Sequence, residues 1–293
     1  MTARLLDGKA LAADFRQELV DRTSAIVARV GAAPRLAIIR FGEAGASDVY
    51  VRSVARAAEQ VGIDAVIVTL PRDAASPLVQ GRMDELNHDA SVAGIVLTEP
   101  LPAGLSKTET AARIDPTKDV DGASPVNAGW LARGEPQLLP ATALAVMTIL
   151  RRNDVPIAGR RAVVVGRSSV IGRPAALLLL AADATVVVCH SRTRDLAAET
   201  RRAEILVVGA GQPGLIGGDM VSPGCVVIDC GINSTPNGLL GDVDFEAVRR
   251  VAAAITPVPG GVGPVTSMMV IAQTVQAAEG IAAGARGPSQ AAG

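Results

Sequence analysis

The stretch around which this chain is organised runs from residue 161 to 193, RAVVVGRSSVIGRPAALLLLAADATVVVCHSRT. An apolar run ends at Gly166, a polar turn leads to Gly172, and an aliphatic segment and a second apolar run follow. This order predicts a strand, a turn, a helix and a strand, which form one βαβ unit. The N–H groups of such a turn attract anions, so it is a candidate site for dinucleotide phosphates. Only two glycines are present instead of the three of GxGxxG, and an ordinary turn in a parallel sheet has the same pattern.

Lysine, tyrosine, cysteine and histidine are scarce in this chain. The chain has three lysines, Lys9, Lys107 and Lys118, and one tyrosine, Tyr50. Its cysteines, at positions 189, 225 and 230, and its two histidines do not have the spacing of a metal site. We therefore expect no metal, and we expect the cysteines to belong to the core.

Length and charge limit the class of protein. At 293 residues the chain can hold two domains, and its formal net charge of −1 gives no basic surface for nucleic acid or for an acidic membrane. No run of about 18 apolar residues is present, and the N-terminal sequence MTARLLDGKALAADF lacks the apolar segment of a signal peptide. We expect a cytoplasmic protein with a small-molecule substrate and with no nucleic-acid or membrane partner.

Over the first 125 residues, the predicted helices and strands alternate along the chain. Apolar periodicity predicts helices at 7–30, 47–61 and 75–88, strands at 35–41, 65–70 and 92–97, and a short helix at 108–114. Ser47 is placed to cap the second helix. The segment PTKDVDG, residues 116–122, is a turn. This alternation predicts a layered α/β unit with a mostly parallel sheet.

The second half has the pattern of a doubly wound sheet. One helical pattern begins near residue 141, and a second follows the cap residue Asp244. A third runs from 267 to 282 and is followed by a tail that we expect to be frayed. Strands are predicted at 162–165, 185–188, 205–208, 226–229 and 254–257. The predicted fold class is α/β with two domains. Residues 1–139, completed by the C-terminal helix 266–293, are predicted to form the first domain, and residues 140–265 the second, doubly wound domain.

Several motifs in this order resemble one enzyme family. They are SDVYV (47–51), PTKDVDG (116–122), GRSSVIGRPAALLL (166–179), CHSRT (189–193), GDVDF (241–245) and ITPVPGGVGPVT (255–266). Together they resemble the bifunctional methylenetetrahydrofolate dehydrogenase/methenyltetrahydrofolate cyclohydrolase family over nearly the whole chain. The resemblance implies that residues 1–139 with helix 266–293 are a substrate domain, that residues 140–265 are a Rossmann-like NADP-binding domain, and that a cleft lies between them. It also implies NADP(H) as cofactor, a tetrahydrofolate derivative as substrate, and a homodimer.

The resemblance also implies a set of cofactor-binding residues. Arg167 and Ser191 would face the 2′-phosphate of NADP, and a guanidinium suits a phosphate; alternatively, both are solvated loop residues. The implied set is Gly166, Arg167, Ser168, Ile171, Gly172, His190, Ser191, Gly211, Pro213, Gly231, Ile232 and Thr266.

On the substrate side, the resemblance implies roles for Tyr50, for Asp121, and for the turn Pro259-Gly260-Gly261. The Asp121 carboxylate suits the amino-pyrimidine donors of a pterin. Each residue has a simpler interpretation as well. Tyr50 fits a half-buried aromatic, Asp121 fits a turn former, and the two glycines fit a tight turn.

The catalytic position that departs from the family is Val54. The family carries a lysine four residues after the tyrosine, on the same helix face, and valine cannot hold or transfer a proton. Thr98 stands where the family usually has glutamine, and Glu99 follows it. We assign Thr98 and Glu99 to the substrate site, although Glu99 is equally well a surface loop charge.

These departures leave three functional hypotheses. The first is a folate dehydrogenase that keeps hydride transfer and has lost the cyclohydrolase activity. The second is a reductase of another cyclic imine or iminium, because the loss of one positive charge and the gain of a negative one favour a cation. The third is a non-catalytic binding partner.

Overall fold

The computed structural model describes residues 2–42, 48–236 and 238–284. The described chain divides into two compact units. The six-stranded unit contains residues up to 12 together with 142–266, and the three-stranded unit contains residues 13–141 and the chain from 267 onward. The divisions fall inside or at the start of three helices, α1 (Gly8–Val30), α6 (Ala141–Arg152) and α10 (Val262–Ala282).

The six-stranded unit is built on an all-parallel sheet with the order β6-β5-β7-β8-β11-β1. From β5 the chain goes first to β6 on one side and then to β7 on the other side of β5. The switch point of the doubly wound fold therefore lies between β5 and β7. The predicted fold class is thereby confirmed. The strands are β1 (Arg4–Leu5), β5 (Arg161–Val165), β6 (Thr185–Cys189), β7 (Ile205–Val208), β8 (Val226–Asp229) and β11 (Ala254–Ile255).

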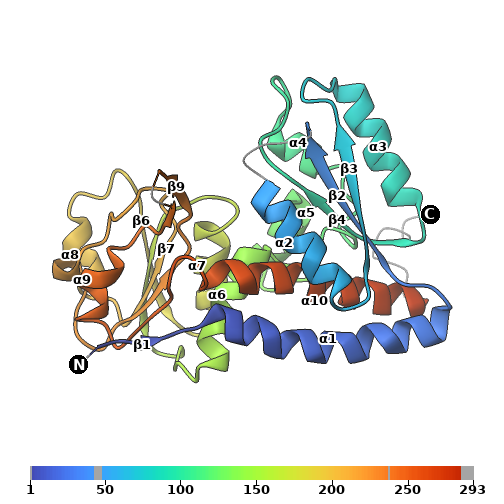
Figure 1. Ribbon diagram of the computed structural model, residues 1–293. Helices are drawn as coiled ribbons and strands as arrows, with labels where there is room; N and C mark the ends of the chain where they lie inside the picture. The colour runs from blue at the N-terminus through green and yellow to red at the C-terminus, as the bar shows by residue number, and fades with distance from the viewer. Residues whose placement is uncertain (1, 43–47, 237, 285–293) are drawn as a thin grey trace. The chain divides into compact units, whose positions relative to one another are not determined.

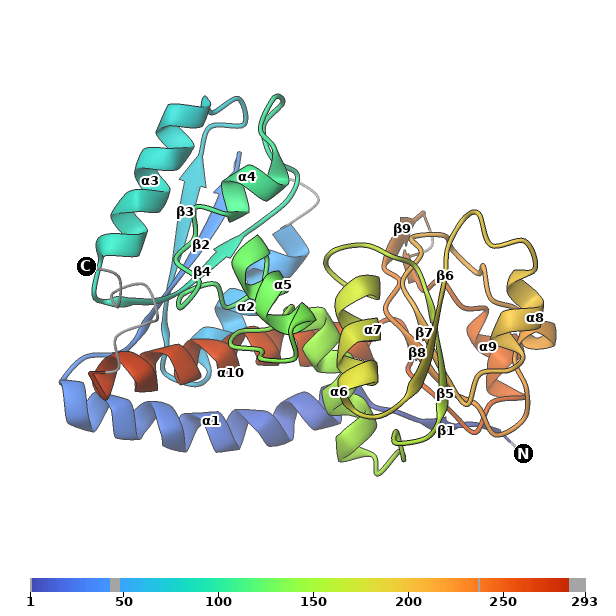
Figure 2. The same ribbon diagram turned by 180° about the vertical axis from the view of Figure 1, so that it is seen from behind.

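Helices cover both faces of this sheet. Figures 1 and 2 show α6 and α7 (Gly172–Ala181) on one face, with α8 (Leu196–Thr200) and α9 (Phe245–Arg249) on the other. Sheets covered in this way need strands that are apolar on both sides. The β7 sequence ILVV meets this requirement, because all four of its residues are buried.

The three-stranded unit has a parallel sheet in the order β3-β2-β4. Alternate residues of the central strand serve its two faces. Ala37 and Ile39 join one apolar cluster with Val79 and Met83 of α3, whereas Ile38 is buried on the opposite face. The elements are β2 (Arg35–Phe41), α2 (Asp48–Glu59), β3 (Asp64–Leu70), α3 (Ser76–His88), β4 (Val92–Leu97), α4 (Lys107–Ala111) and α5 (Pro125–Ala132).

The N-terminal segment differs from the sequence prediction. Residues 2–12 were expected in the substrate domain, but Arg4 and Leu5 pair with Ala254 and Ile255 at the edge of the six-stranded sheet. The Ala3 N–H also donates to the Arg249 carbonyl at 2.8 Å. A strand of two residues is too short to produce a periodic signal, so only the tertiary pairing reveals it.

Three other elements also depart from the prediction. Between the predicted strand at 226–229 and the helix after Asp244, where no strand was predicted, β9 (Asn233–Thr235) and β10 (Gly238–Leu240) pair as an antiparallel hairpin. Helix α10 begins at Val262 rather than 267, because Pro264 is tolerated in a first turn. The unpredicted α5 is capped by Ser124, which accepts from the Val126 N–H at 3.2 Å. The predicted cap at Ser47 and the predicted frayed tail lie outside the described residues, apart from residue 284.

Over the described ranges, none of the helices has both the length and the apolar character needed to cross a membrane. The same part of the chain contains no group of three or more His, Cys, Asp or Glu placed to hold a metal ion.

Candidate functional site

The turn at residues 116–122 uses its lysine to hold the end of a helix. The Lys118 ammonium donates to the carbonyls of Asn87 at 2.7 Å, Asp89 at 2.8 Å and Leu86 at 3.3 Å. These carbonyls lie at and just after the C-terminus of α3 and need partners. Lys118 is 7% exposed, and burial lowers its pKa. This lysine is therefore committed to the fold.

The first aspartate of the turn is committed as well. The Asp119 carboxylate accepts hydrogen bonds from the Ala123 N–H at 2.9 Å, the Ser124 N–H at 2.8 Å and the Asn127 side chain at 2.9 Å. Asp119 is completely buried, and it fixes the start of α5. The second aspartate, Asp121, is the acid of this turn left to meet a ligand.

Asp121 and Tyr50 form the centre of the candidate substrate site. The Tyr50 hydroxyl donates to the Asp121 carboxylate. Burial, followed by the charge of Asp119, raises the pKa of Asp121 to about 7, although the bond from Tyr50 opposes that shift. Burial and the nearby Asp121 charge raise the pKa of Tyr50 well above its ordinary value. Near neutral pH the pair thus consists of a neutral phenol and a carboxyl group that exchanges its proton.

The backbone around Asp121 is held from α10. The Gln273 side chain donates to the carbonyls of Val120 and Leu139, both at 2.8 Å, and accepts from the Leu139 N–H at 2.6 Å. Gly122 has φ +65°, and a Cβ there would lie 2.2 Å from the Pro140 nitrogen. Gln273 was missed by sequence reasoning, and its one signal was a polar side chain within a mostly apolar helix.

Val54 lies on the buried face of α2, one turn beyond Tyr50, and is completely buried. Nearby on the same helix, the Ser53 hydroxyl lies 2.8 Å from the Ser267 hydroxyl of α10. The side chain at position 54 therefore packs as an apolar residue and carries no group that can exchange a proton.

The residues after β4 have separate roles. Thr98 is 3% exposed, and its hydroxyl donates to the Ile39 carbonyl at 3.0 Å, so its proton is used inside the fold. Glu99 is exposed and forms an ion pair with Lys107, the first residue of α4. Lys107 favours the ionised form of Asp121, and Glu99 opposes it. A lysine distant in sequence thus acts on the site that lacks one at position 54.

The predicted turn Pro259-Gly260-Gly261 belongs to the six-stranded unit, as does Thr266. A Cβ on Gly8 would lie 1.7 Å from the Gly261 carbonyl oxygen, so these backbones are in close contact. Tyr50 and Asp121 belong to the other unit. A joint role of the two sets, and a cleft between the domains, stay predictions.

The predicted cofactor turn follows β5. Gly166 has φ +118°, and a Cβ there would lie 2.2 Å from the Gly209 carbonyl oxygen. A Cβ on Gly172 would lie 2.2 Å from the Gly166 carbonyl oxygen. The Ser168 hydroxyl accepts from the N–H groups of Ile171 at 3.1 Å and of Gly172, the first residue of α7, at 3.4 Å, so it orders the turn that leads into this helix. Strand, turn and helix are thus packed as closely as in a dinucleotide-binding fold.

Arg167 and Ser191 are exposed and follow adjacent strands, since Val165 of β5 pairs with Cys189 of β6. The turn after β6 is ordered by His190, whose N–H donates to the Thr193 hydroxyl at 2.9 Å. Its Nδ1 also accepts from a backbone N–H at 3.1 Å. A guanidinium and a hydroxyl on adjacent strand ends fit the 2′-phosphate of NADP.

The remaining predicted cofactor residues line two further turns of the same sheet edge. Gly211 has φ +67° and is exposed, like Pro213. Gly231 is buried against Asp242, whereas Ile232 is 64% exposed. The aspartates that shape these turns, Asp229 and Asp242, were not predicted.

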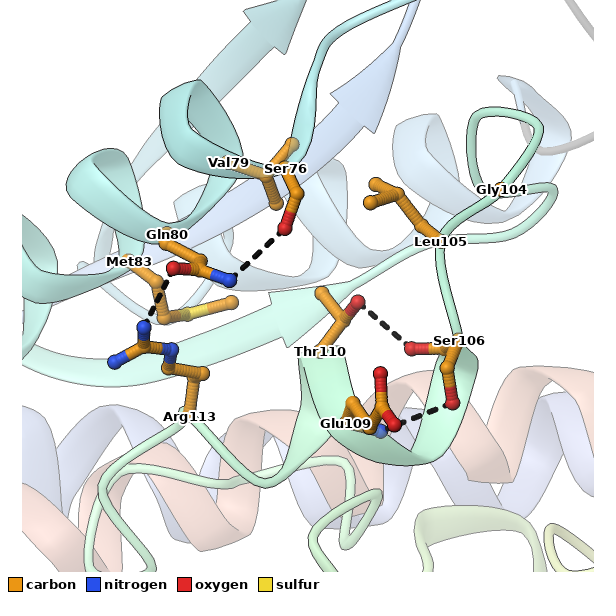
Figure 3. Close-up of a pocket in the computed structure, with 10 residues that line it drawn as sticks. All are labelled: Ser76, Val79, Gln80, Met83, Gly104, Leu105, Ser106, Glu109, Thr110 and Arg113. Carbon is orange, nitrogen blue, oxygen red and sulfur yellow. Dashed lines mark hydrogen bonds between the residues drawn. The ribbon is translucent and has the colours of Figure 1, made fainter.

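A separate cavity of about 90 Å³ lies in the three-stranded unit, between α3 and the segment 104–113 (Figure 3). Its polar groups already bond one another. Arg113 donates to Gln80 at 2.6 Å, and Gln80 donates to Ser76 at 2.9 Å. None of the predicted site residues lines it.

The fold and these turns define a two-unit α/β protein of the dinucleotide-binding class. A family model described as tetrahydrofolate dehydrogenase/cyclohydrolase, catalytic domain, matches residues 6–121. The corresponding NAD(P)-binding domain model matches residues 140–282. The chain belongs to the tetrahydrofolate dehydrogenase/cyclohydrolase family, and the resemblance found in its motifs is confirmed.

Individual relatives match over almost their full length. The chain is 48% identical over 280 residues to the bifunctional protein FolD of Roseiflexus sp. (strain RS-1), covering 95% of this chain and 97% of that protein. The solved structure of FolD from Campylobacter jejuni has a TM-score of 0.92 at 42% identity, covering 94% and 99% of the two chains. The Trypanosoma brucei dehydrogenase-cyclohydrolase, solved with NADP and an inhibitor, has a TM-score of 0.90 at 38% identity and covers 95% and 98%.

Proposed function

We propose that this protein is an NADP-dependent 5,10-methylenetetrahydrofolate dehydrogenase that lacks effective methenyltetrahydrofolate cyclohydrolase activity. Family membership and the NADP-bound relative support the dehydrogenase activity. The observation that separates the two activities is the buried Val54 one turn beyond Tyr50. The comparisons name folate enzymes and favour neither the imine reductase nor the non-catalytic partner.

Hydride transfer requires positioning of the two reactants more than proton transfer. The bound cofactor would accept the hydride from the methylene carbon, while the adjacent nitrogen lone pair forms the iminium bond. The chain would hold the pterin through the ionised Asp121 carboxylate, which accepts hydrogen bonds from the amino-pyrimidine donors. Tyr50 orients that carboxylate through its hydroxyl. Neither role needs a group at position 54.

Hydrolysis of the methenyl cation has a different requirement, because water must be activated and a proton carried away. In the family, the resemblance assigns this role to the lysine that follows the tyrosine. Valine cannot perform it. Lys107 is paired with Glu99 and acts on Asp121 from α4, so we propose an electrostatic role for it and no proton transfer.

Two assays test this proposal on the purified protein. Incubation with NADP⁺ and methylenetetrahydrofolate is expected to produce NADPH. Incubation with methenyltetrahydrofolate alone is expected to give decay close to the uncatalysed rate. The absence of NADPH formation would contradict the dehydrogenase. Rapid methenyl decay would show instead that another group has replaced the lysine.

We also propose a preference for NADP(H) over NAD(H), a homodimer, and a cytoplasmic location. The preference is supported by the exposed Arg167 and Ser191 on adjacent strand ends. The homodimer and the location are extensions from the family. Light scattering at micromolar concentration should give about twice the chain mass of 29.8 kDa, and a mass equal to one chain would contradict the dimer.

A further inference from the structure

Two buried carboxylates lie at the carboxyl end of the six-stranded sheet, next to the predicted cofactor residues. Asp229 is the last residue of β8 and is 3% exposed. Asp242 follows the β9–β10 hairpin and is completely buried. Buried carboxylates are costly unless donors surround them. The hydrogen-bond donors around Asp229 and Asp242 show which backbone segments the two carboxylates hold in place.

The Asp242 carboxylate is surrounded by one backbone turn. Its Oδ2 accepts from the N–H groups of Ala210 at 2.6 Å and Gly211 at 2.8 Å. Its Oδ1 accepts from the Gln212 N–H at 2.9 Å and from the Asn233 side chain at 2.8 Å. Three consecutive N–H groups thus point at one side chain. The path of the chain just after β7 depends on it.

Asp229 in turn holds the backbone of Asp242. The Asp242 N–H donates to Asp229 Oδ1 at 3.0 Å, and the Val243 N–H donates to Oδ2 at 3.0 Å. A Cβ on Gly241 would lie 1.9 Å from Asp229 Oδ2, and one on Gly231 would lie 2.4 Å from the Asp242 carboxyl carbon. Both positions must therefore be glycine for the carboxylates to fit.

The turn held by Asp242 adjoins the predicted phosphate turn. Strand β7 lies beside β5, and the position of a Cβ on Gly166 is only 2.2 Å from the Gly209 carbonyl oxygen. Residues 210–213 are exposed on their outer side, at the switch point of the sheet. Because the N–H groups of 210–212 point inward to Asp242, this turn can meet a cofactor with its outer surface alone.

We infer that Asp242 is a positioning residue of the NADP(H) site, which sets the 210–213 turn against the cofactor without touching it. The inference rests on the proposed function for the identity of the ligand. An error in the path of this turn would weaken NADP(H) binding. It would leave the proposed pterin-binding groups of the three-stranded unit, Tyr50 and Asp121, unchanged.

Asp242→Asn is the direct test, because it keeps the size of the side chain and turns an amide NH₂ toward backbone N–H donors. We expect the Kd for NADPH, measured by fluorescence titration, and the KM for NADP⁺ to rise at least tenfold. The kcat at saturating NADP⁺ should stay within threefold of wild type. A residue that only supports folding would lower the active fraction, so that kcat falls while Kd and KM do not change.

Asp244→Asn is the matched control, because Asp244 lies two residues away and only caps α9, accepting from the Ala247 N–H at 3.0 Å. Its Kd should stay within twofold of wild type. If Asp242→Asn does not fold, Asp229→Asn provides a milder displacement, with a smaller increase in Kd expected.

An unchanged Kd in a folded Asp242→Asn protein, or an equal loss of NADPH affinity in Asp244→Asn, would overturn the inference and leave the proposed function unaffected. It would also be overturned if neither Asp242→Asn nor Asp229→Asn folds, because the carboxylates would then serve the fold. Wild-type protein that does not bind NADPH would contradict the proposed function as well.

Discussion

At residue 54, one substitution changes both the charge and the solvation of the site. A lysine in this position would lie on the buried, apolar face of α2, where the wild-type valine is completely buried. Burial disfavours the charged form of an amine and lowers its pKa, which suits a proton carrier. The valine removes that chemistry, and Lys107 acts on Asp121 only as a charge, from an exposed ion pair with Glu99. Hydride transfer and hydrolysis should therefore separate in this protein.

Val54→Lys should restore part of the cyclohydrolase activity at a cost in stability. A positioned acid–base group contributes about 10²–10⁴ in rate, so methenyl decay should accelerate by roughly 10²-fold or more. The midpoint of thermal unfolding should fall, because the new amine is buried. Val54→Met is the control, because methionine has a similar length to lysine but no group that can donate or accept a proton. An equal rate in the lysine and methionine variants, with folate binding demonstrated, would mean that the pocket has changed beyond this residue.

Arg167→Ala should weaken NADP(H) selectively. Loss of a charge-assisted contact costs about 1.5–3 kcal/mol, and NAD(H) lacks the 2′-phosphate that makes it. Titration calorimetry with both cofactors measures the difference. Arg160→Ala is a suitable control, because Arg160 precedes β5 at the opposite end of the strand and pairs with Glu204. Equal losses for both cofactors would contradict the assignment of the 2′-phosphate.

The folate KM should depend on pH through Asp121. Its pKa of about 7 means that the carboxylate that accepts the pterin donors forms as pH rises through neutrality, so KM should fall there. Lys107→Met removes a charge that favours ionisation and should move the midpoint upward, whereas Glu99→Gln should move it downward. Arg82→Gln, on an exposed ion pair of α3, is the control. Midpoints that do not move would exclude electrostatic action by the Glu99–Lys107 pair.

At the scale of elements, the KDVDG turn depends on a glycine that has no room for a side chain. A Cβ at Gly122 would lie 2.2 Å from the Pro140 nitrogen, and its φ of +65° is unfavourable for other residues. Gly122→Ala should therefore lower the free energy of unfolding by roughly 3 kcal/mol or more. It should also displace Asp121 and raise the folate KM.

Gly104→Ala isolates the backbone contribution, since Gly104 has φ +85° but a Cβ there would meet no atom of the described residues within 4 Å. It should cost only about 1–2 kcal/mol in urea unfolding. Similar costs for the two variants would mean that the backbone near Pro140 moves aside easily.

The elements that sequence reasoning placed well are those with a strong local pattern. The βαβ unit of residues 161–189 is one, because an apolar run, a glycine turn and an aliphatic helix follow each other directly. The short strand β1 and the hairpin β9–β10 have no such pattern, and they form through pairing that a local pattern does not encode.

The same division applies to the site. Tyr50, Asp121 and Gly166 carry their signal in residue type and motif. Gln273 and Asp242 act by hydrogen bonds to segments 134 and about 30 residues away. The action of Lys107 on Asp121 depends on where α4 begins. Contacts of this kind are set by tertiary structure, so one sequence alone does not reveal them.

At the scale of the whole molecule, each unit contains an aspartate whose pKa burial raises well above its ordinary value. Burial raises the pKa of Asp229 to about 6 in the six-stranded unit, and that of Asp121 to about 7 in the other. Between the ordinary value of 3.8 and these values, the folded chain binds protons that the unfolded chain has released. Stability must therefore fall as pH rises from about 4 to about 7 and then level off for these groups.

Asp121→Asn should remove the larger part of this dependence. The variant cannot ionise at position 121, so its free energy of unfolding relative to wild type should increase steadily from pH 4 to about pH 7 and stay constant above. Partial access of water to Asp121 reduces the effect, and we expect a change on the order of 2 kcal/mol over this range. Urea unfolding at several pH values measures it, with the exposed Asp73→Asn as control. A difference that does not vary with pH would mean that Asp121 ionises equally easily in the folded and unfolded chain. The same variant should bind folate poorly at every pH, because the acceptor that serves the pterin is the group that costs stability.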